Sequence, residues 1–533
     1  MKYIILYDTV QDFVNGEGQE PDGDNMKSKV PGVAYTVEVE KVDYNPLPEK
    51  ALIFENMTQT AGTIYLKAAG SAPKISLDWS TDNILYTTVS SNETPVADDT
   101  LTFTLPAGGR LYLKGNNTRM ATSTEKFWHF SGSVDYQLFG DLMCIVADET
   151  EMTQDYEFVG LFEWDAHLKK VNNGVLSAPV VSNYGYYDMF NGTGLVEMPS
   201  LTANTVGNYG YSYMFRNIQF STVTELPAMN LGEHCYDNMF RWAGITGMTG
   251  TLPATTLAPY CYASMFNNCR NITMAPEIMA TNAYPFCFAG MFSECYSLTT
   301  PPIMHIQTLT GNGDNNLAIE CCEYMFNTCT SLTGTPTFFQ NITIVNSWYA
   351  FQYMFWNCTN LTHAEDLPAT TAQPYAYAGM FRGCTSLTTP PAIGLETLYH
   401  DDIQGNHCYE MFRDCTSLTA TPQIKVTSLA PGCFCDMFKG CTTITSMSNL
   451  PALNLVKNCY SGMFSGCSRL SSVKAMFLEY PIYDQQPTPQ VIPSITGWMD
   501  GVAANGIFTK NSSATWNNAD VVPNGWTVTT ANS

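Results

Sequence analysis

Apolar residues recur along most of the chain in a phrase of fixed form. A Met-Phe pair comes first, a cysteine follows three residues after the phenylalanine, a leucine stands three residues beyond it, and proline comes next, as in "MFRGCTSLTTPP" at 380–391. An aromatic residue precedes the methionine by three positions, and a small residue precedes it by four. Counted from the small residue, the apolar positions are 0, 1, 4, 5, 8 and 11. This spacing predicts a short helix with one buried face, ended by the proline.

The phrase repeats at a nearly constant interval, usually 25 or 26 residues. Its Met-Phe pairs begin at Met189, Met214, Met239, Met265, Met291, Met325, Met354, Met380, Met411, Met437 and Met463, and Leu161-Phe162 is a degenerate twelfth copy. A short extended segment, such as "LPATTL" at 252–257, lies between phrases. One coil of this kind cannot bury its apolar face alone, so neighbouring coils must stack. We therefore expect a solenoid of about twelve coils over residues 148–478.

The segments on either side of the repeats follow other patterns. Residues 47–147 alternate apolar and polar positions in short stretches separated by turn residues, which predicts an antiparallel β-sandwich. Residues 479–533 begin with a proline-rich linker and continue with Trp498, Phe508, Trp516 and Trp526, which we expect to cover the last coil as a C-terminal capping module. The expected fold is mainly β with short helices, preceded by an arm at 1–46.

The repeat resembles the BspA-type leucine-rich repeats found in surface proteins of phages and gut bacteria. The family phrase, a "CY..MF.GCTSLT..P" unit alternating with "LPATTLA", is matched best at 252–273 and 367–388. The run at 111–146 resembles the β-domain that often precedes such repeats, and 495–528 resembles a closing segment that follows them in phage-encoded proteins. The first 46 residues resemble N-terminal segments of virion structural proteins from phages of gut anaerobes. These resemblances imply the solenoid fold, surface exposure, adhesion and an N-terminal anchor.

Composition narrows the function classes. The net charge is −24, which argues against nucleic-acid binding because phosphate contacts require lysine and arginine. No run approaches 18 consecutive apolar residues, so no membrane insertion is predicted. The N-terminal residues lack a signal-peptide core, which favours a protein assembled into particles in the cytoplasm.

The chain has 18 cysteines, and all except Cys144 lie in the repeats, mostly at fixed positions. A catalytic nucleophile needs one special cysteine beside a base, and zinc needs closely spaced ligand pairs. Two cysteines of one coil would lie about two helical turns apart, too far for a disulfide. Alanine replaces cysteine at Ala350 and Ala376. We therefore interpret the cysteines as small core residues and expect no catalytic residue, metal or cofactor.

Three intervals between repeats are longer than the others, at 34, 29 and 31 residues. Their inserts, near 305–316, 338–349 and 396–406, are expected on one face of the solenoid. The candidate recognition residues in them are Asp314, Phe338, Phe339, Trp348, Tyr349, Tyr399, Asp401 and Asp402. Aromatic and acidic groups suit glycan stacking or protein docking, and the alternative is tolerated loop variation.

These observations predict a non-enzymatic phage virion surface protein: a head fibre, a capsid decoration or a tail-associated adhesin. Its expected partners are capsid or tail proteins at the N-terminal region, further copies of itself in a homo-oligomer such as a trimer, and a host-surface or mucus glycan or protein. One alternative is a bacterial cell-surface adhesin whose leader lies outside this sequence. A carbohydrate-active enzyme with paired carboxylates is the other.

Overall fold

The computed structural model describes residues 50–533 except 148–150, 249, 310–318, 401–404, 484–489 and 532–533. The expected N-terminal arm at 1–46 lies outside the described residues. Residues 50–533 form one unit and are mainly β, as the sequence predicts. One hydrophobic core cluster extends from Leu52 to Trp526, so the three segments distinguished in the sequence share a continuous core.

Two sheets occupy the N-terminal part of this unit. The first has the order β10-β9-β1-β6-β3-β4, with β10 (Leu168–Val171), β9 (Tyr136–Gly140), β1 (Leu52–Asn56), β6 (Arg110–Gly115), β3 (Ser76–Ser80) and β4 (Thr87–Ser90). The second has the order β5-β2-β8-β7, with β5 (Thr100–Leu105), β2 (Gly62–Ala69), β8 (Lys126–Gly132) and β7 (Ala121–Ser123). Phe54 of β1 and Phe130 of β8 have ring centroids 5.1 Å apart, so the sheets pack face to face.

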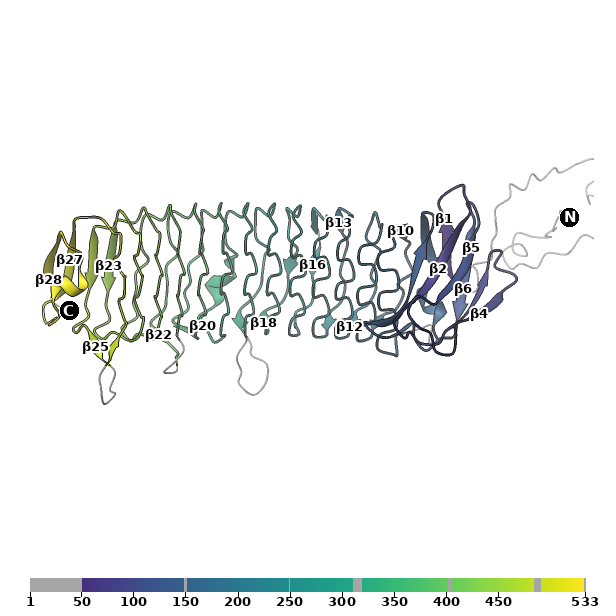
Figure 1. The fold of residues 1–533 in the computed structure, drawn as a ribbon, viewed down its shortest axis with the longest axis horizontal. Coiled ribbons are helices and arrows are strands. Elements are labelled where there is room, and N and C mark those ends of the chain that lie inside the picture. Colours follow the sequence, from purple (N-terminus) through teal and green to yellow (C-terminus); the bar gives the residue numbers. More distant parts are fainter. Residues whose placement is uncertain are drawn as a thin grey trace, which may run out of the picture. The chain divides into compact units, whose positions relative to one another are not determined.

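The repeats begin directly on the edge of the first sheet. Strand β10 belongs to the degenerate first repeat and pairs in parallel with β9, whereas β1 pairs with β9 in antiparallel fashion. Strand β9 therefore has a hydrogen-bonded neighbour on each side, and the repeat array continues the sheet without an exposed edge there (Figure 1).

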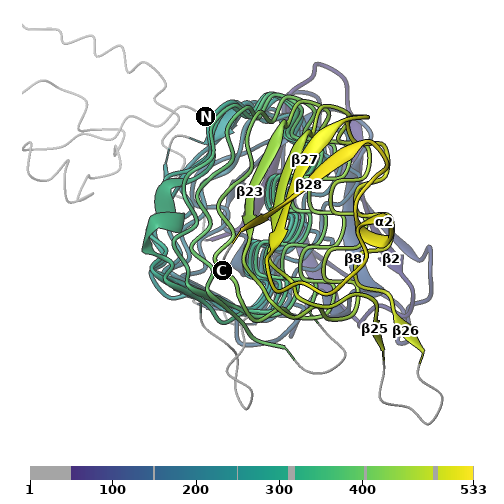
Figure 2. The same ribbon diagram turned by 90° about the vertical axis from the view of Figure 1, so that its left-hand side faces the viewer.

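Successive repeats lie side by side and are joined by short parallel strands (Figures 1 and 2). These strands are β11 (Val180–Val181), β12 (Thr205–Val206), β13 (Thr222–Val223), β14 (Asn230–Leu231), β15 (Gly247–Met248), β16 (Thr251–Leu252), β17 (Glu277–Ile278), β18 (Asn282–Ala283), β19 (Thr308–Leu309), β20 (Ile344–Val345), β21 (Thr371–Ala372) and β22 (Thr397–Leu398). Each pairs with the equivalent residues of an adjoining repeat, as Val345 does with Ala372 and Ala372 with Leu398.

The short helix predicted in each repeat is wrong, because the Met-Phe phrase forms a series of turns. In the repeat around Met239, the N–H of Met239 donates to the Tyr236 carbonyl at 3.2 Å, whereas the N–H of Phe240 donates to the Met265 carbonyl of the next repeat at 2.9 Å. Backbone donors alternate in this way along the tract, and an α-helix would direct every one of them to its own repeat. The apolar spacing therefore has a period of four residues, which resembles the helical period of 3.6 over so short a tract.

Every fourth residue of the tract adopts a left-handed backbone conformation. In the same repeat these residues are His234, Asn238 and Trp242, with φ of 55°, 55° and 60°. Several other repeats place glycine, asparagine or aspartate at these positions, the residues that tolerate this region best. Glycine is required at Gly379, where φ is +59° and a Cβ atom would lie 2.2 Å from the Tyr353 ring of the preceding repeat.

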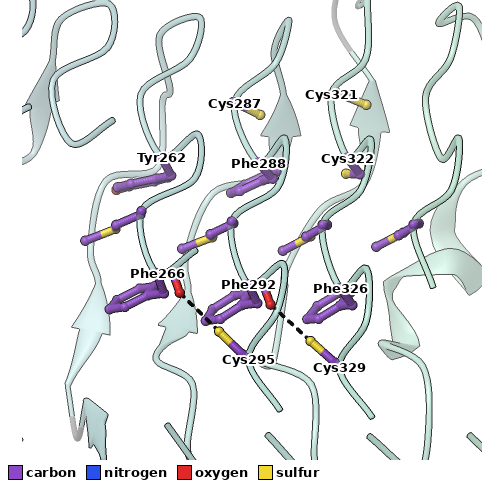
Figure 3. Packing of buried hydrophobic residues seen from close by; sticks show 14 of the residues in the cluster. Tyr262, Phe266, Cys287, Phe288, Phe292, Cys295, Cys321, Cys322, Phe326 and Cys329 are labelled. Atoms are coloured by element: carbon purple, nitrogen blue, oxygen red, sulfur yellow. Dashed lines mark hydrogen bonds between the residues drawn. The ribbon is translucent and has the colours of Figure 1, made fainter. Parts of the chain in front are cut away.

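The phenylalanine of each Met-Phe pair belongs to one continuous stack of twelve buried rings (Figure 3). Adjacent rings have centroids 5.3–5.9 Å apart and planes within 13° of parallel. The rings are Phe162, Phe190, Phe215, Phe240, Phe266, Phe292, Phe326, Phe355, Phe381, Phe412, Phe438 and Phe464. The centroid separation is larger than the spacing between hydrogen-bonded strands because the rings are offset from one another. Offset stacking is an arrangement that aromatic pairs favour.

All 18 cysteines are free thiols, and each except Cys435 is buried. Eight of the eleven Met-Phe pairs are followed by a cysteine, whose Sγ donates to the carbonyl of the preceding repeat's phenylalanine over 2.9–3.2 Å, as Cys295 does to Phe266 (Figure 3). Burial raises the pKa of these thiols, to about 12 for Cys329, Cys415 and Cys467. The cysteines are therefore core residues, and they also supply a weak hydrogen-bond donor that alanine lacks.

The C-terminal segment extends the parallel array. Strands β23 (Ser446–Leu450), β24 (Ser472–Ala475), β27 (Gly506–Asn511) and β28 (Trp526–Ala531) form one parallel sheet in that order (Figure 2). Helix α2 (Asn518–Val521) precedes β28, and β25 (Ile482–Tyr483) pairs with β26 (Val491–Ile492) in a separate antiparallel ribbon. Trp498, Phe508, Trp516 and Trp526 are buried, and Trp498 packs on Phe464 with ring centroids 6.2 Å apart. The segment therefore closes the stack of rings while adding two further strands.

The ring stack and the thiol ladder should differ in their contribution to stability. Phe381→Ala removes a buried ring between Phe355 and Phe412 and should lower the free energy of unfolding by about 3–5 kcal/mol, whereas Cys384→Ala should lower it by about 1–2 kcal/mol. Urea unfolding followed by circular dichroism would measure both. Equal losses would contradict the assignment of Phe381 to the core stack.

The burial of the thiols predicts their reactivity. Alkylation of the native protein without reductant should modify Cys435 alone, and the Cys435→Ser variant should take up no label. After denaturation, still without reductant, intact mass should show 18 alkyl groups. Several labelled cysteines in the native protein, or fewer than 18 in the denatured one, would contradict buried free thiols.

Candidate binding surface

Phe338 and Phe339 are not surface recognition residues, which corrects the prediction for this insert. They lie in the 3-10 helix η3 (Thr337–Asn341) and are 1% and 2% exposed. Their rings lie 6.2 and 5.2 Å from that of Phe351. The preceding repeat has Cys322 where Tyr262 and Phe288 stand in the earlier ones (Figure 3). The insert therefore adds aromatic volume to the core beside a position that has lost a ring.

The other described candidates of the inserts lie near one another. Trp348 donates from Nε1 to the Gln373 side chain at 3.2 Å, and Tyr349 stacks on Tyr375 with centroids 4.7 Å apart. Tyr399 is 50% exposed and directly follows β22, as Gln373 directly follows β21. The parallel register of β20, β21 and β22 thus brings these inserts to one side of the coils. Asp314, Asp401 and Asp402 lie outside the described residues.

One buried polar group holds the backbone of Tyr399. His407 is fully buried, and its Nε2 lies 2.8 Å from the Tyr399 carbonyl. Burial lowers the pKa of His407 to about 4, so the ring is neutral and donates to this carbonyl at neutral pH. His407 occupies the small-residue position of its repeat, and Cys408 occupies the aromatic position, so the two exchange sizes.

The turn tracts form a second exposed face, which the sequence analysis missed. Its first left-handed column begins with Tyr156, Tyr184, Tyr209, His234, Tyr260 and Phe286, and the candidate residue Tyr349 and its neighbour Tyr375 continue the column in later repeats. Neighbouring rings among the first six are 4.2–4.6 Å apart and within 16° of parallel. Because each ring covers its neighbour's face, only the ring edges remain for solvent. This column therefore stabilises the stack and offers little surface for stacking a ligand.

The residue after each core phenylalanine is half-buried in ten repeats and buried in two, at Asn191 and Ser293. Four of these residues are arginines: Arg216, Arg241, Arg382 and Arg413. Arg382 and Arg413 both form salt bridges to Glu410, and the Arg382–Glu410 distance is 2.6 Å. Arg216 and Arg241 instead lie over the Trp242 ring, 4.8 and 4.3 Å from its centroid. Their recurrence after Met-Phe is visible in the sequence, but the predicted helix gave no reason to place them on one face with Trp242.

Glu163 and Asp188 are neighbouring carboxyl groups of the turn face with raised pKa values. Burial, with a smaller contribution from Asp188, raises the pKa of Glu163 to about 7, and burial raises that of Asp188 to about 6. Arg216 opposes the shift of Asp188. This part of the face therefore gains negative charge as the pH rises through the neutral range.

The Glu163 shift predicts a pH dependence of stability. The unfolded chain loses this proton near the ordinary pKa of 4.5, and the folded chain retains it until about 7, so the free energy of unfolding falls as the pH rises between these values. Glu163→Gln should therefore be unchanged in stability at low pH and more stable than the parent by about 1–2 kcal/mol above pH 7, after allowance for solvent screening. The matched control is exposed Glu233→Gln, and equal pH profiles for parent and Glu163→Gln would contradict the burial effect.

Other kinds of site were sought over the same part of the chain. Among the described residues, no group of three or more histidine, cysteine, aspartate or glutamate side chains is arranged to hold a metal ion. None of the helices in the described ranges combines the length and apolar character needed to span a bilayer. No protein-family model matches the chain, and no curated protein matches it.

Proposed function

We propose that this chain is a non-enzymatic surface protein of a phage virion that binds host-surface or mucus glycans or proteins. In this proposal residues 148–478 are a BspA-type leucine-rich-repeat solenoid of about twelve coils, and residues 47–147 are a β-sandwich at its start. The observation that carries the proposal is the repeated outward position, where side chains differ from coil to coil over a constant core. At the position after the core phenylalanine, for example, Arg216, Asn267, Trp356 and Lys439 follow identical buried rings.

This arrangement suits recognition because the side chains that face outward are different from those that form the core. The phenylalanine stack and the hydrogen bonds between repeats are formed by buried rings and backbone groups. An outward side chain can therefore change without loss of a core contact, and several coils together can present an extended binding surface. The inserts near Trp348 and Tyr399 add further exposed groups on another side of the coils.

The virion location rests on the resemblance of the first 46 residues to phage structural proteins. In the proposal this region binds capsid or tail proteins, and the protein forms a homo-oligomer such as a trimer. A head fibre, a capsid decoration and a tail-associated adhesin are the three locations that fit. A bacterial surface adhesin is the second candidate, favoured by the same repeats, since they occur in both settings.

Electron microscopy of purified particles tests the proposal directly. Particles should show protrusions that antibodies against residues 50–533 label, and antibody treatment should reduce adsorption to host cells. Label on the bacterial envelope, with none on particles, would favour the bacterial adhesin. Turnover of a polysaccharide, abolished by substitution of one carboxylate, would instead indicate the carbohydrate-active enzyme.

A further inference from the structure

We propose that Arg216 and Arg241, with Tyr213 and Trp242, form a binding site for an anionic sugar residue, one that carries a carboxylate or a sulfate. The proposal rests on the adhesive function proposed above and names the ligand class for one place on the turn face. It concerns two adjoining coils, because Arg216 and Arg241 occupy the same position in successive repeats.

The four side chains are held together by ring contacts. The Arg216 guanidinium lies 5.4 Å from the Tyr213 ring centroid and 4.8 Å from that of Trp242, and the Arg241 guanidinium lies 4.3 Å from the latter. Trp242 is fixed by its left-handed backbone and by its N–H, which donates to the Asn267 carbonyl at 3.0 Å, yet it remains 38% exposed. Stacking on one indole limits the freedom of both guanidinium groups, which reduces the entropy lost when a ligand binds.

Among the described residues, neither Arg216 nor Arg241 has a salt-bridge partner. Within the described part of the chain no carboxylate lies at salt-bridge distance from either, although acidic residues outnumber basic ones two to one, 48 to 24. The Nε atoms of Arg216 and Arg241 are buried without a hydrogen-bond partner among the described residues, and Arg241 uses Nη1 to contact Asn238 at 3.2 Å. Arg382 and Arg413, at the same position of later coils, both form salt bridges with Glu410, and Arg413 also lies 3.4 Å from Asp414. An oxyanion would provide the first two arginines with the charge-assisted hydrogen bonds that Glu410 provides elsewhere.

Two carboxyl groups lie near the arginines, and among the described contacts neither forms a salt bridge with them. Asp237 is engaged by His234 at 3.1 Å and by the Asn238 amide at 2.5 Å. Asp188 lies within electrostatic reach of Arg216 but forms no salt bridge with it, and burial opposes its ionisation. With a pKa of about 6, Asp188 is mostly ionised at pH 7 and becomes mostly protonated below pH 6, where a bound anion would meet less repulsion.

The neighbouring groups favour a sugar over an acidic peptide. Tyr213 and Trp242 offer aromatic surface of the kind on which the C–H face of a pyranose packs. The half-buried Asn217 amide lies in the same coil as Arg216 and donates from Nδ2 to Asn191 of the preceding coil at 3.0 Å, whereas the Asn238 amide is already engaged by Asp237 and Arg241. Amides both donate and accept hydrogen bonds, which suits hydroxyl groups. An acidic sugar has a group for each kind of side chain here. Its anion would bind the two guanidinium groups, its ring would pack on the aromatic side chains, and its hydroxyl groups would bond to the amide.

The full chain should be tested by calorimetry and glycan-array binding against oligosaccharides that carry sialic acid, uronic acid or sulfate, each beside its neutral parent, and against a polyglutamate peptide. Arg216→Gln/Arg241→Gln should weaken binding of the acidic oligosaccharides by about tenfold or more and abolish the preference over the neutral parents. Arg216→Lys/Arg241→Lys keeps the charge but not the forked geometry, so its affinity for the acidic oligosaccharides should lie between those of the parent and the glutamine double variant. The matched control is Lys126→Gln/Lys425→Gln, which changes the net charge equally at two exposed lysines outside the turn face. Equal thermal unfolding of all variants would show that they fold.

Each other outcome overturns the inference. Equal affinity for acidic and neutral sugars, affinity unchanged in the glutamine double variant, or no binding of any acidic sugar at millimolar concentration would do so. Tighter binding of polyglutamate than of any sugar would assign the site to an acidic peptide. The carboxylate and sulfate series separate the two sources of the anion. If the sugar site fails this test, antibody-labelled protrusions on particles that adsorb to hosts would still support the proposed function. Particles that lack the protein would contradict the proposed function itself.

Discussion

The stack depends on hydrogen bonds that no repeat can make alone. In each turn tract every second N–H donates to a carbonyl of the next repeat, as Tyr236, Asn238 and Phe240 do to Cys261, Ala263 and Met265. A buried amide without a partner is costly, so an isolated repeat would leave half of the donors in its tract unsatisfied. The repeats can therefore be ordered only as neighbours, and the ends need special segments. The two antiparallel sheets begin the stack through β10 on β9, and β27 and β28 continue it at the other end.

The same constraint explains the composition of the core. Equivalent residues of adjoining coils lie in register, so a core side chain packs mostly against the same type of side chain in the next coil. Flat rings at a constant separation fill the space between coils better than side chains of irregular shape. Cysteine is small enough to lie beneath the rings and still donates to a carbonyl one coil back. Two positions that have lost an aromatic ring have extra volume nearby: Phe338 and Phe339 lie beside Cys322, and His407 lies beside Cys408. The core therefore accommodates a large and a small side chain that exchange neighbouring positions more readily than a net loss of side-chain volume.

Recognition, in this view, uses side chains from adjoining coils together. Arg216 and Trp242 belong to different repeats, and only the lateral packing of the coils brings a guanidinium of one onto the indole of the next. Arg382, Arg413 and Glu410 show the same geometry with the charge satisfied internally. A small change in sequence at one outward column can therefore convert a structural ion pair into a site for an external anion, while the buried columns stay as they are.

The sequence by itself determined the repeat, its period, the residues that enter the core and the mainly β character, because burial of an apolar residue follows from its recurrence alone. It also identified the cysteines as core residues, since their regular positions did not suit a catalytic nucleophile, a zinc site or a disulfide. It could not distinguish turns from a helix, because apolar positions at 0, 1, 4, 5 and 8 fit both periods; backbone hydrogen bonding between coils decided that question. Nor could it place Phe338 and Phe339 inside, or Arg216 on the Trp242 indole, because these contacts join residues 12 to 26 positions apart through the lateral register of the stack. That register is a property of neighbouring coils, and only the tertiary structure contains it.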